Sequence, residues 1–434
     1  VIKKQKSMQV FNHPSSETWL PLLQRPVMEA ASLEKTTRKI LAKVKVGGDR
    51  AVRKYTKQFD GVSLRNLMVS EKEMLTAEAS IDETLKQAIH LATNNIRRFH
   101  ASQLSDEARV VTMPGIECWR RMVPIEKVGL YIPGGSAPLF STLLMLGIPA
   151  TLAGCKEIVV CTPPDKEGKL HPAICYAAQH IGIKKIYKVG GIQAIAAMAY
   201  GTESIPPVYK IFGPGNQYVT AAKQLVQQEG VAIDMPAGPS EVCVLADDTA
   251  VPEFVAADLL SQAEHGSDSQ VLLISTSAAL VEAVKAALST QLSALPRASI
   301  AERALANSKA VVVANEKQAI DMANAYAAEH LILASNRAED YVPHIVNAGS
   351  VFIGNYAPES VGDYASGTNH TLPTNGYARA YSGVSIDSFV KKITFQQLSQ
   401  NGLIAIGPSV VALAEAEGLA AHAQAVRVRM QYKQ

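Results

Sequence analysis

Cysteine is scarce in this 434-residue chain, and its placement excludes two of its common uses. The five cysteines are scattered, odd in number and include no CxxC pair. This pattern argues against a disulfide framework and against a zinc site built on thiolates. It indicates reduced thiols, so we expect a cytoplasmic protein.

A strong excess of one charge is also missing. The net charge is only +3, with basic and acidic residues interspersed. We therefore expect neither nucleic acid nor an anionic membrane as a partner. The longest apolar stretch, 143–155, is broken by Gly147 and Pro149 and is too short to cross a bilayer. The basic stretch 1–13 is not followed by an apolar segment, so no secretory signal is expected.

No complete GxGxxG motif is present, although the chain has the rhythm of an α/β protein. Short β-rich runs at 128–132, 157–162, 186–189 and 208–212 are mostly followed by glycine turns and helical segments. This alternation predicts a parallel, doubly wound sheet with ligands at the carboxyl ends of its strands. The turns alone leave two interpretations open, a dinucleotide site or tight turns without a ligand.

A second series of strands and helices runs from 270 to 354, so two α/β domains are expected in a chain of this length. No low-complexity linker separates the two series. The turn residues at 237–240 suggest a boundary there. Residues 18–102 have a mostly helical pattern, and the sequence does not declare their function.

The stretch 260–266 reads as the last turn of a helix that begins at Pro252 and stops at Gly266. On that helix Asp258, Gln262 and His265 share one face, near the negative end of the helix dipole, where a cation is favoured. The alternative is an ordinary polar end of a surface helix.

Glu329 and His330 are expected to end a helix that begins at Glu316. Adjacent helical residues diverge by about 100°, so two bonds to one metal are awkward for this pair. A carboxylate beside an imidazole suits acid–base chemistry instead. The alternative is a capped helix end with His330 satisfied in the core.

The segment 355–376 is predicted to be a long irregular loop, and loops of this length are usually functional or disordered. In it, Asp363 is a plausible metal ligand and His370 a plausible substrate contact, although both fit a solvated loop. A final helix, about 410–430, carries Glu417 and His422. Together, Gln262, His265, Asp363 and His422 offer nitrogen and oxygen donors, which suit zinc in an open site. Spacing alone does not single out these four among the many polar residues of the chain.

Six segments, in this order, closely resemble the histidinol dehydrogenase family, and the resemblance runs from about residue 20 to the C-terminus. The segments are Tyr131-Ile-Pro-Gly-Gly-Ser, Gly213-Pro-Gly-Asn, Asp234-Met-Pro-Ala-Gly-Pro-Ser-Glu, Ser261-Gln-Ala-Glu-His-Gly, Ala328-Glu-His-Leu and Gly367-Thr-Asn-His.

The resemblance implies a cytosolic, zinc-dependent homodimer that performs the final step of histidine biosynthesis. It implies a four-electron oxidation of L-histidinol to L-histidine through bound L-histidinaldehyde, with two NAD+. His330 would take the alcohol proton, and Glu329 with His330 would activate water for the second oxidation. No cysteine nucleophile is expected.

The resemblance also implies the binding residues. One zinc per subunit would be held by Gln262, His265, Asp363 and, from the partner subunit, His422. Substrate contacts would be Ser240, Gln262, His265, His330, Asp363, His370, Glu417 and His422. Contacts to NAD would be Tyr131, Gln193 and Asn216. Zinc would position the substrate rather than exchange electrons.

The implied fold has two incomplete Rossmann-like domains with mostly parallel sheets, and terminal segments exchanged in a dimer. We expect an N-terminal segment at 1–27, a first α/β domain from 28–130 together with 240–381, a second domain at 131–239, and a C-terminal segment at 382–434 that reaches the partner's site. Two other functions use the same residues, a zinc hydrolase without NAD and a dimer in which zinc is only structural.

Overall fold

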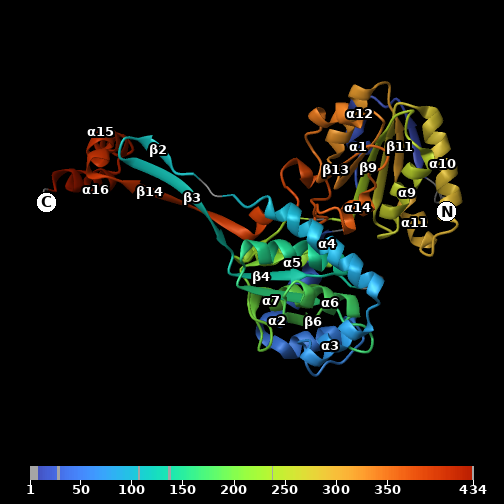
Figure 1. Cartoon of the computed structure of the whole chain (residues 1–434), viewed down its shortest axis with the longest axis horizontal. Helices are drawn as coiled ribbons and strands as arrows, with labels where there is room; N and C mark the ends of the chain where they lie inside the picture. Colours follow the sequence, from blue (N-terminus) through green and yellow to red (C-terminus); the bar gives the residue numbers. More distant parts are fainter. Residues whose placement is uncertain (1–7, 27–29, 106–107, 135–137, 237, 433–434) are drawn as a thin grey trace.

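Two parallel sheets and a projecting arm make up the computed structural model, which describes residues 8–26, 30–105, 108–134, 138–236 and 238–432 (Figure 1). The expected α/β fold with mostly parallel sheets is confirmed. No helix in the described ranges is both long and apolar enough to cross a membrane. All five cysteines are free thiols.

The first sheet has six parallel strands in the order β1 (Gln9–Asn12), β11 (Lys309–Val312), β10 (Gln270–Ser275), β9 (Glu241–Ala246), β12 (His330–Ala334) and β13 (Ser350–Ile353). Its central strand β9 is buried along its whole length. Val242 and Val244 pack on the side of α9 (Pro252–Ala263), α10 (Ala278–Leu292) and α11 (Ala298–Leu305). Cys243 and Leu245 face the opposite side, which α12 (Glu316–Tyr326) covers. Alternation with a period of two therefore gives one strand two apolar faces.

The second sheet has five parallel strands in the order β6 (Lys185–Lys188), β5 (Glu157–Thr162), β4 (Lys127–Tyr131), β7 (Lys210–Phe212) and β8 (Ala232–Ile233). Helices α5 (Phe140–Ala153) and α6 (Pro172–His180) cover one face. Helices α7 (Gly191–Tyr200) and α8 (Gln217–Gln228) cover the other. The chain adds β5 and β6 on one side of β4 and then β7 and β8 on the other side. Such a reversal of strand order opens a crevice at the carboxyl end of β4.

The helical lead-in packs on the second sheet. Helix α2 (Ala30–Phe59) contacts α7 and α8, α3 (Glu71–Ser80) contacts α6, and α4 (Glu83–Ala101) contacts α5. The apolar stripes of α2 and α4 are buried in the two cores of that sheet. The sequence predicted that 28–130 belongs with 240–381 in the first domain. For α2, α3 and α4 the structure differs, because these helices pack on the second sheet. The N-terminal segment, expected at 1–27, adds β1 to the first sheet; 1–7 and 27 lie outside the described residues.

The arm consists of a three-stranded antiparallel sheet and two helices (Figure 1). Strand β3 (Ile116–Pro124) lies between β2 (Val110–Met113) and β14 (Val390–Leu398), and it pairs with β14 from end to end. Helices α15 (Gln400–Ala416) and α16 (Ala420–Gln431) pack on each other beyond the sheet. The expectation of a single helix at about 410–430 is therefore wrong. Gly418, with φ 75°, separates two helices, and the first of them begins ahead of Pro408.

Short elements complete the chain. Helix α1 (Trp19–Leu22) follows β1, and α13 (Ala338–Tyr341) follows β12. The segment 355–376, expected to be irregular throughout, contains the helix α14 (Glu359–Tyr364). Short 3-10 turns lie at Ser16–Thr18, Val342–His344, Tyr377–Arg379 and Ile386–Phe389.

The packing of α4 can be tested with Ile96→Ala. Ile96 is fully buried in the core shared with α5, so we expect the free energy of unfolding to fall by about 2–5 kcal/mol. The matched control is Leu91→Ala on the same helix, where the side chain is 59% exposed and little change is expected. Equal losses in urea unfolding would contradict the packing of α4 on the second sheet.

Candidate functional site

The site lies where the two sheets meet, in a cavity of about 290 Å³. The second sheet contributes loops that follow the carboxyl ends of its strands, including Pro133 after β4 and Gly213 after β7. The first sheet contributes the opposite ends of its strands, because Glu241 begins β9 and His330 begins β12. Only the second sheet therefore follows the rule that ligands bind at carboxyl strand ends.

Glu329 and His330 precede and begin a strand, so the expectation that they end a helix is wrong. Helix α12 stops at Tyr326, and Ala327 turns the chain with φ 54°. His330 then pairs with Val242 of β9 in the parallel ladder. Both side chains are buried, and both line the cavity between the sheets.

The backbone of Glu241 orients this pair. Its N–H donates to Glu329 Oε2 at 3.0 Å, and its carbonyl oxygen lies 3.3 Å from His330 Nδ1. When Nδ1 carries the proton and donates it to that carbonyl, Nε2 is left with its lone pair. Nε2 is buried and lies 3.4 Å from Asp363 Oδ1. The strand therefore turns Nε2 toward Asp363, which lines the same cavity.

Two acidic residues on α14 complete the surroundings of His330. Glu359 and Asp363 are four residues apart, which places them on one face of the helix. Glu359 Oε1 lies 3.9 Å from His330 Nδ1. Glu329 Oε2 lies 3.8 Å from the same nitrogen. One imidazole thus sits among three carboxyl groups.

The crowding of carboxyl groups shifts their titration. Burial, partly opposed by His330, raises the pKa of Glu329 to about 8. Burial likewise raises the pKa of Glu359 to about 8. Burial lowers the pKa of His330, but Glu359, Glu329 and Asp363 outweigh it and raise that pKa to about 10. Burial also acts to raise the pKa of Asp363, but His330 lowers it overall.

A divalent cation fits these groups. Ligand atoms of His265, Glu359 and Asp363 lie within 4.8 Å of one another. Glu359 Oε2 and Asp363 Oδ1 are buried without a hydrogen-bond donor among the described residues. Carboxylate and imidazole donors suit zinc, and a cation would favour the ionised state of the carboxyl groups.

Gln262 borders the same cluster and is fully buried in the last turn of α9. Both atoms of its amide are satisfied when Nε2 donates to Glu359 Oε1 and Oε1 accepts the N–H of Glu241 at 2.9 Å. His265 follows just after the end of α9 and is exposed toward the cavity. Both residues therefore lie near the C-terminus of a helix, as the sequence predicted.

Glu359 is the neighbour that the sequence interpretation missed. The only available signal was its spacing of four from Asp363, and that spacing is informative only if the segment is helical. The segment was expected to be irregular, so the spacing carried no weight.

His370 connects the two halves of the site. Its Nδ1 lies 2.8 Å from the carbonyl oxygen of Asp363, and its Nε2 lies 3.1 Å from Thr142 Oγ1 on α5. Burial lowers its pKa. Ser240, expected to touch substrate, also lines the cavity. Both residues therefore lie where a ligand would contact them.

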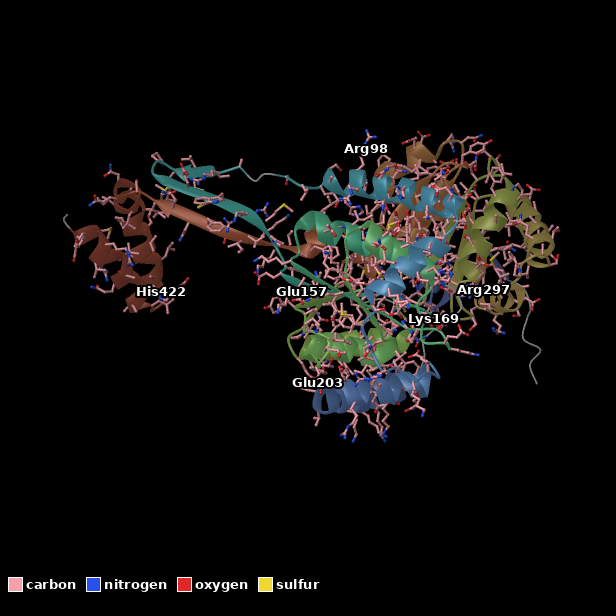
Figure 2. The ribbon with its side chains drawn as sticks, turned by 60° about the horizontal axis from the view of Figure 1, so that its bottom comes forward. Arg98, Glu157, Lys169, Glu203, Arg297 and His422 are labelled. Atoms are coloured by element: carbon pink, nitrogen blue, oxygen red, sulfur yellow. The ribbon has the colours of Figure 1, made fainter. Side chains whose placement is uncertain are left out.

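His422 lies on the helical end of the arm, away from the two parallel sheets (Figure 2), and Glu417 belongs to the same part of the arm. Glu417 caps α15, His422 is in the first turn of α16, and both are exposed. Within one chain these two residues are not brought to the other expected site residues.

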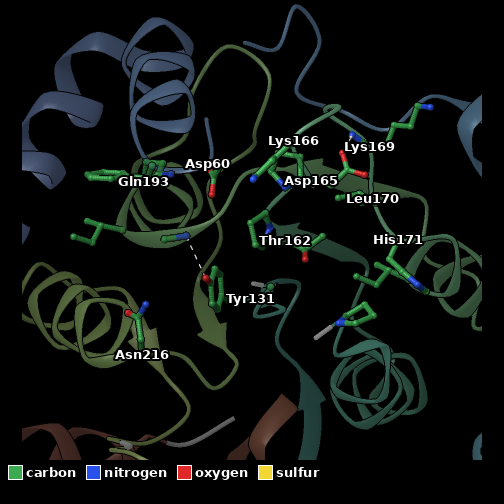
Figure 3. A pocket seen from close by; sticks show the side chains of 18 of the residues that line it. Asp60, Tyr131, Thr162, Asp165, Lys166, Lys169, Leu170, His171, Gln193 and Asn216 are labelled. Carbon is green, nitrogen blue, oxygen red and sulfur yellow. Dashed lines mark hydrogen bonds between the residues drawn. The ribbon is translucent and has the colours of Figure 1, made fainter. Parts of the chain in front are cut away.

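A second, larger cavity of about 950 Å³ lies at the carboxyl ends of the strands of the second sheet (Figure 3). Tyr131, Gln193 and Asn216, the residues expected to contact NAD, all line it. Asn216 lines the smaller cavity as well. The two cavities therefore meet near Asn216, and a long ligand in one could reach the other.

Behind the site, Arg25 anchors the side chain of Glu241. Two guanidinium nitrogens each donate to a Glu241 carboxylate oxygen at 2.8 Å, and one also donates to the Tyr326 carbonyl at 2.6 Å. The guanidinium carbon lies 3.8 Å from the centre of the Tyr326 ring. The pair is almost fully buried, so each partner depends on the other.

Comparisons with known proteins agree along nearly the whole chain. The sequence profile of the histidinol dehydrogenase family matches residues 23–430. The chain belongs to the histidinol dehydrogenase family. Among its relatives, histidinol dehydrogenase from Bacteroides fragilis is 58% identical over 424 residues, which cover 98% of this chain and 99% of that protein. The enzyme from Xanthomonas axonopodis is 54% identical over 94% of this chain and 95% of its own length.

A solved structure gives the same result for the fold. The crystal structure of histidinol dehydrogenase from Elizabethkingia anophelis superposes with a TM-score of 0.95 at 56% identity, covering 98% of both chains. The resemblance noted in six sequence segments is therefore confirmed, and the chain is an oxidoreductase of the histidinol dehydrogenase family.

The anchoring of Glu241 can be tested with Arg25→Met. The change leaves a buried carboxylate without its cation, and we expect the free energy of unfolding to fall by about 3–5 kcal/mol. Arg38→Met is the control, because its ion pair with Glu34 is exposed and its loss is expected to cost below about 1 kcal/mol. Similar losses for both variants in denaturant unfolding would refute the anchoring role.

Proposed function

We propose that this member of the histidinol dehydrogenase family oxidises L-histidinol to L-histidine through bound L-histidinaldehyde, as the final step of histidine biosynthesis in the cytoplasm. Conversion of a primary alcohol to a carboxylate removes four electrons and consumes one water, so each substrate requires two NAD+. The observation that carries the proposal is the pair of Glu329 and His330, both of which line a cavity that meets a larger one at Asn216.

Zinc is the metal we assign to the cluster, one ion per subunit. Gln262, His265 and Asp363 would hold it together with His422 of the partner subunit. The fit is supported by the imidazole of His265 beside the unpartnered buried Oδ1 of Asp363. Glu359, with its own unpartnered Oε2, lies in the same cluster. When bound, zinc supplies a Lewis acid that orients the imidazole and amino groups of the substrate.

His330 is the base of the first oxidation. The carboxylates that raise the pKa of His330 would be neutralised by a bound cation, and the ring would then be available as a base. Its Nδ1 is held by the carbonyl of Glu241, so the neutral ring would accept the proton of the substrate hydroxyl on Nε2 as hydride leaves the adjacent carbon. The acceptor of that hydride is NAD+. Because the ring is fixed by a strand, proton acceptance requires no rearrangement of the backbone.

Glu329 serves the second oxidation. Its carboxylate accepts the N–H of Glu241, and burial places its pKa at about 8, close enough to neutrality for proton transfer. With His330 it would remove a proton from water, and the resulting hydroxide adds to the aldehyde carbonyl. The gem-diol formed then loses hydride to a second NAD+.

Other residues bind and do not transfer protons. Ser240 and His370 line the cavity and would contact the substrate, as would Gln262, His265 and Asp363. Glu417 and His422 of the partner subunit would close the open side. Tyr131, Gln193 and Asn216 would contact NAD+ in the larger cavity.

A homodimer with exchanged terminal segments explains the arm. Its helices expose four large apolar side chains, Ile404 (49%), Leu413 (66%), Leu419 (43%) and Val428 (46%). Exposed apolar residues gathered on one short segment are typical of a surface that another chain covers. In the proposed dimer the arm docks on the partner and completes its site.

The proposed chemistry can be tested by the number of NADH molecules formed per L-histidinol consumed by zinc-loaded protein. We expect two. For Glu329→Gln we expect alcohol oxidation to survive better than oxidation of added L-histidinaldehyde, because the amide cannot accept a proton.

One NADH per histidinol in the unaltered protein would contradict the four-electron reaction. Equal losses of both half-reactions in Glu329→Gln would refute the division of roles. No NADH from folded, zinc-loaded protein would leave hydrolysis or a structural zinc as the function of this cluster.

The shared site can be tested by mixing two inactive variants, His422→Ala and His330→Ala. A hybrid dimer carries one site with both native residues, so random exchange should restore about a quarter of the native activity. The readout is NADH formation after subunit exchange, with each unmixed variant as the control. No recovery after mass spectrometry has verified hybrid dimers would overturn the shared site.

A further inference from the structure

The wall of the larger cavity contains buried polar atoms without partners. Among the described residues, Asp60 Oδ2, Thr162 Oγ1 and both amide atoms of Gln193 are buried and accept or donate no hydrogen bond. Thr162 and Gln193 are at most 1% exposed. Buried polar groups are normally paired, so their accumulation on one wall indicates a polar ligand.

These groups come from three different elements. Asp60 directly follows α2, Thr162 ends β5, and Gln193 is in the first turn of α7. Figure 3 shows Asp60 beside Gln193, with Asn216 on the other side of Tyr131. The carboxyl group of Asp60 is more than half buried, and this burial raises its pKa to about 6. An unpaired carboxyl group therefore stands next to an unpaired amide.

Dinucleotide-binding sheets usually place a carboxylate just after the second strand, where it binds the ribose hydroxyls of NAD. Here the second strand is β5, and it ends in Thr162 followed by two prolines. The next acid, Asp165, is already used, because its Oδ1 accepts the backbone N–H groups of Glu167 at 2.9 Å and Lys169 at 2.8 Å. Asp60 and Asp165 are the two carboxylates among the described residues that line the larger cavity, and of these only Asp60 lacks a hydrogen-bond donor.

We propose that Asp60 accepts hydrogen bonds from the 2′- and 3′-hydroxyls of the adenosine ribose of NAD+ and thereby selects NAD+ over NADP+. The inference rests on the proposed function, in which this cavity holds NAD+. Asn216 lines both cavities, so the nicotinamide end lies near Asn216 and the adenosine end toward Asp60. A 2′-phosphate would bring up to two negative charges against this carboxylate.

The experiment measures binding of NAD+ and of NADP+ by isothermal titration calorimetry, with zinc-loaded protein and no histidinol. The variant is Asp60→Asn, which removes the charge without changing the shape. The matched control is Asp165→Asn, which removes a charge from the same cavity wall and keeps an oxygen that can accept the loop N–H groups. Thermal unfolding of both variants verifies that they are folded.

We expect Asp60→Asn to weaken NAD+ binding about 10-fold or more, since hydrogen bonds to a charged group are lost. NADP+ binding should not weaken, so the NAD+/NADP+ preference falls by at least about 10-fold. Asp165→Asn should change the preference by less than about 3-fold, because Asp165 Oδ1 is already bound by two loop N–H groups.

An unchanged preference in Asp60→Asn, with NAD+ still bound, would overturn the assignment and leave the proposed function standing. An equal loss for both dinucleotides would also overturn it, because Asp60 would then act at a part that NAD+ and NADP+ share. Failure of the unaltered protein to bind NAD+ would overturn the proposed function together with this inference.

Discussion

The backbone of Glu241 is the constraint on which the candidate site depends. Its N–H and carbonyl groups hold Glu329 and His330, while Arg25 fixes its side chain from behind. All of these contacts form because β9 and β12 are hydrogen-bonded neighbours in one buried sheet. Strand register therefore sets the geometry of Glu329 and His330, the proposed acid–base pair, and the core of the first sheet supports it on both faces. Reactive groups placed in this way lose little conformational freedom when a ligand binds.

The same placement has an electrostatic cost. Three carboxyl groups surround one imidazole in a buried position, and the raised pKa values of Glu329 and Glu359 express the difficulty of ionising them together. A cluster of this kind is stable when protons or a cation neutralise it. Because Asp363 and His265 open toward the cavity, a cation there is accessible to a ligand. This accessibility is what the proposed substrate-binding role of zinc requires.

The sequence predicted elements better than their assembly. Strand, turn and helix alternation predicted most strands of both sheets, since a buried parallel strand such as β10 reads as a continuous apolar run. The central strand β9 was not among the predicted runs, because the second series was expected to begin at 270. Assembly was harder, because nothing in the amphipathic pattern of α2 or α4 says which sheet it covers. The strand position of His330 was missed, because the turn at Ala327 occurs in an alanine-rich run with no glycine or proline to mark it. Glu359 was missed because its partner is four residues away only on a helix. Most candidate residues came from the resemblance, not from spacing.

The position of the site between two sheets has a further consequence. Each sheet supplies part of the lining, and the contact between His370 Nε2 and Thr142 Oγ1 is a polar link across the cavity. A change in the angle between the sheets would alter the distance from His330 to Asn216, and with it the approach of a ligand that occupies both cavities. The first sheet contributes the proposed acid–base groups and the second contributes the larger cavity. A reaction that needs both is therefore sensitive to the packing between the sheets, even where no residue of the site itself is changed.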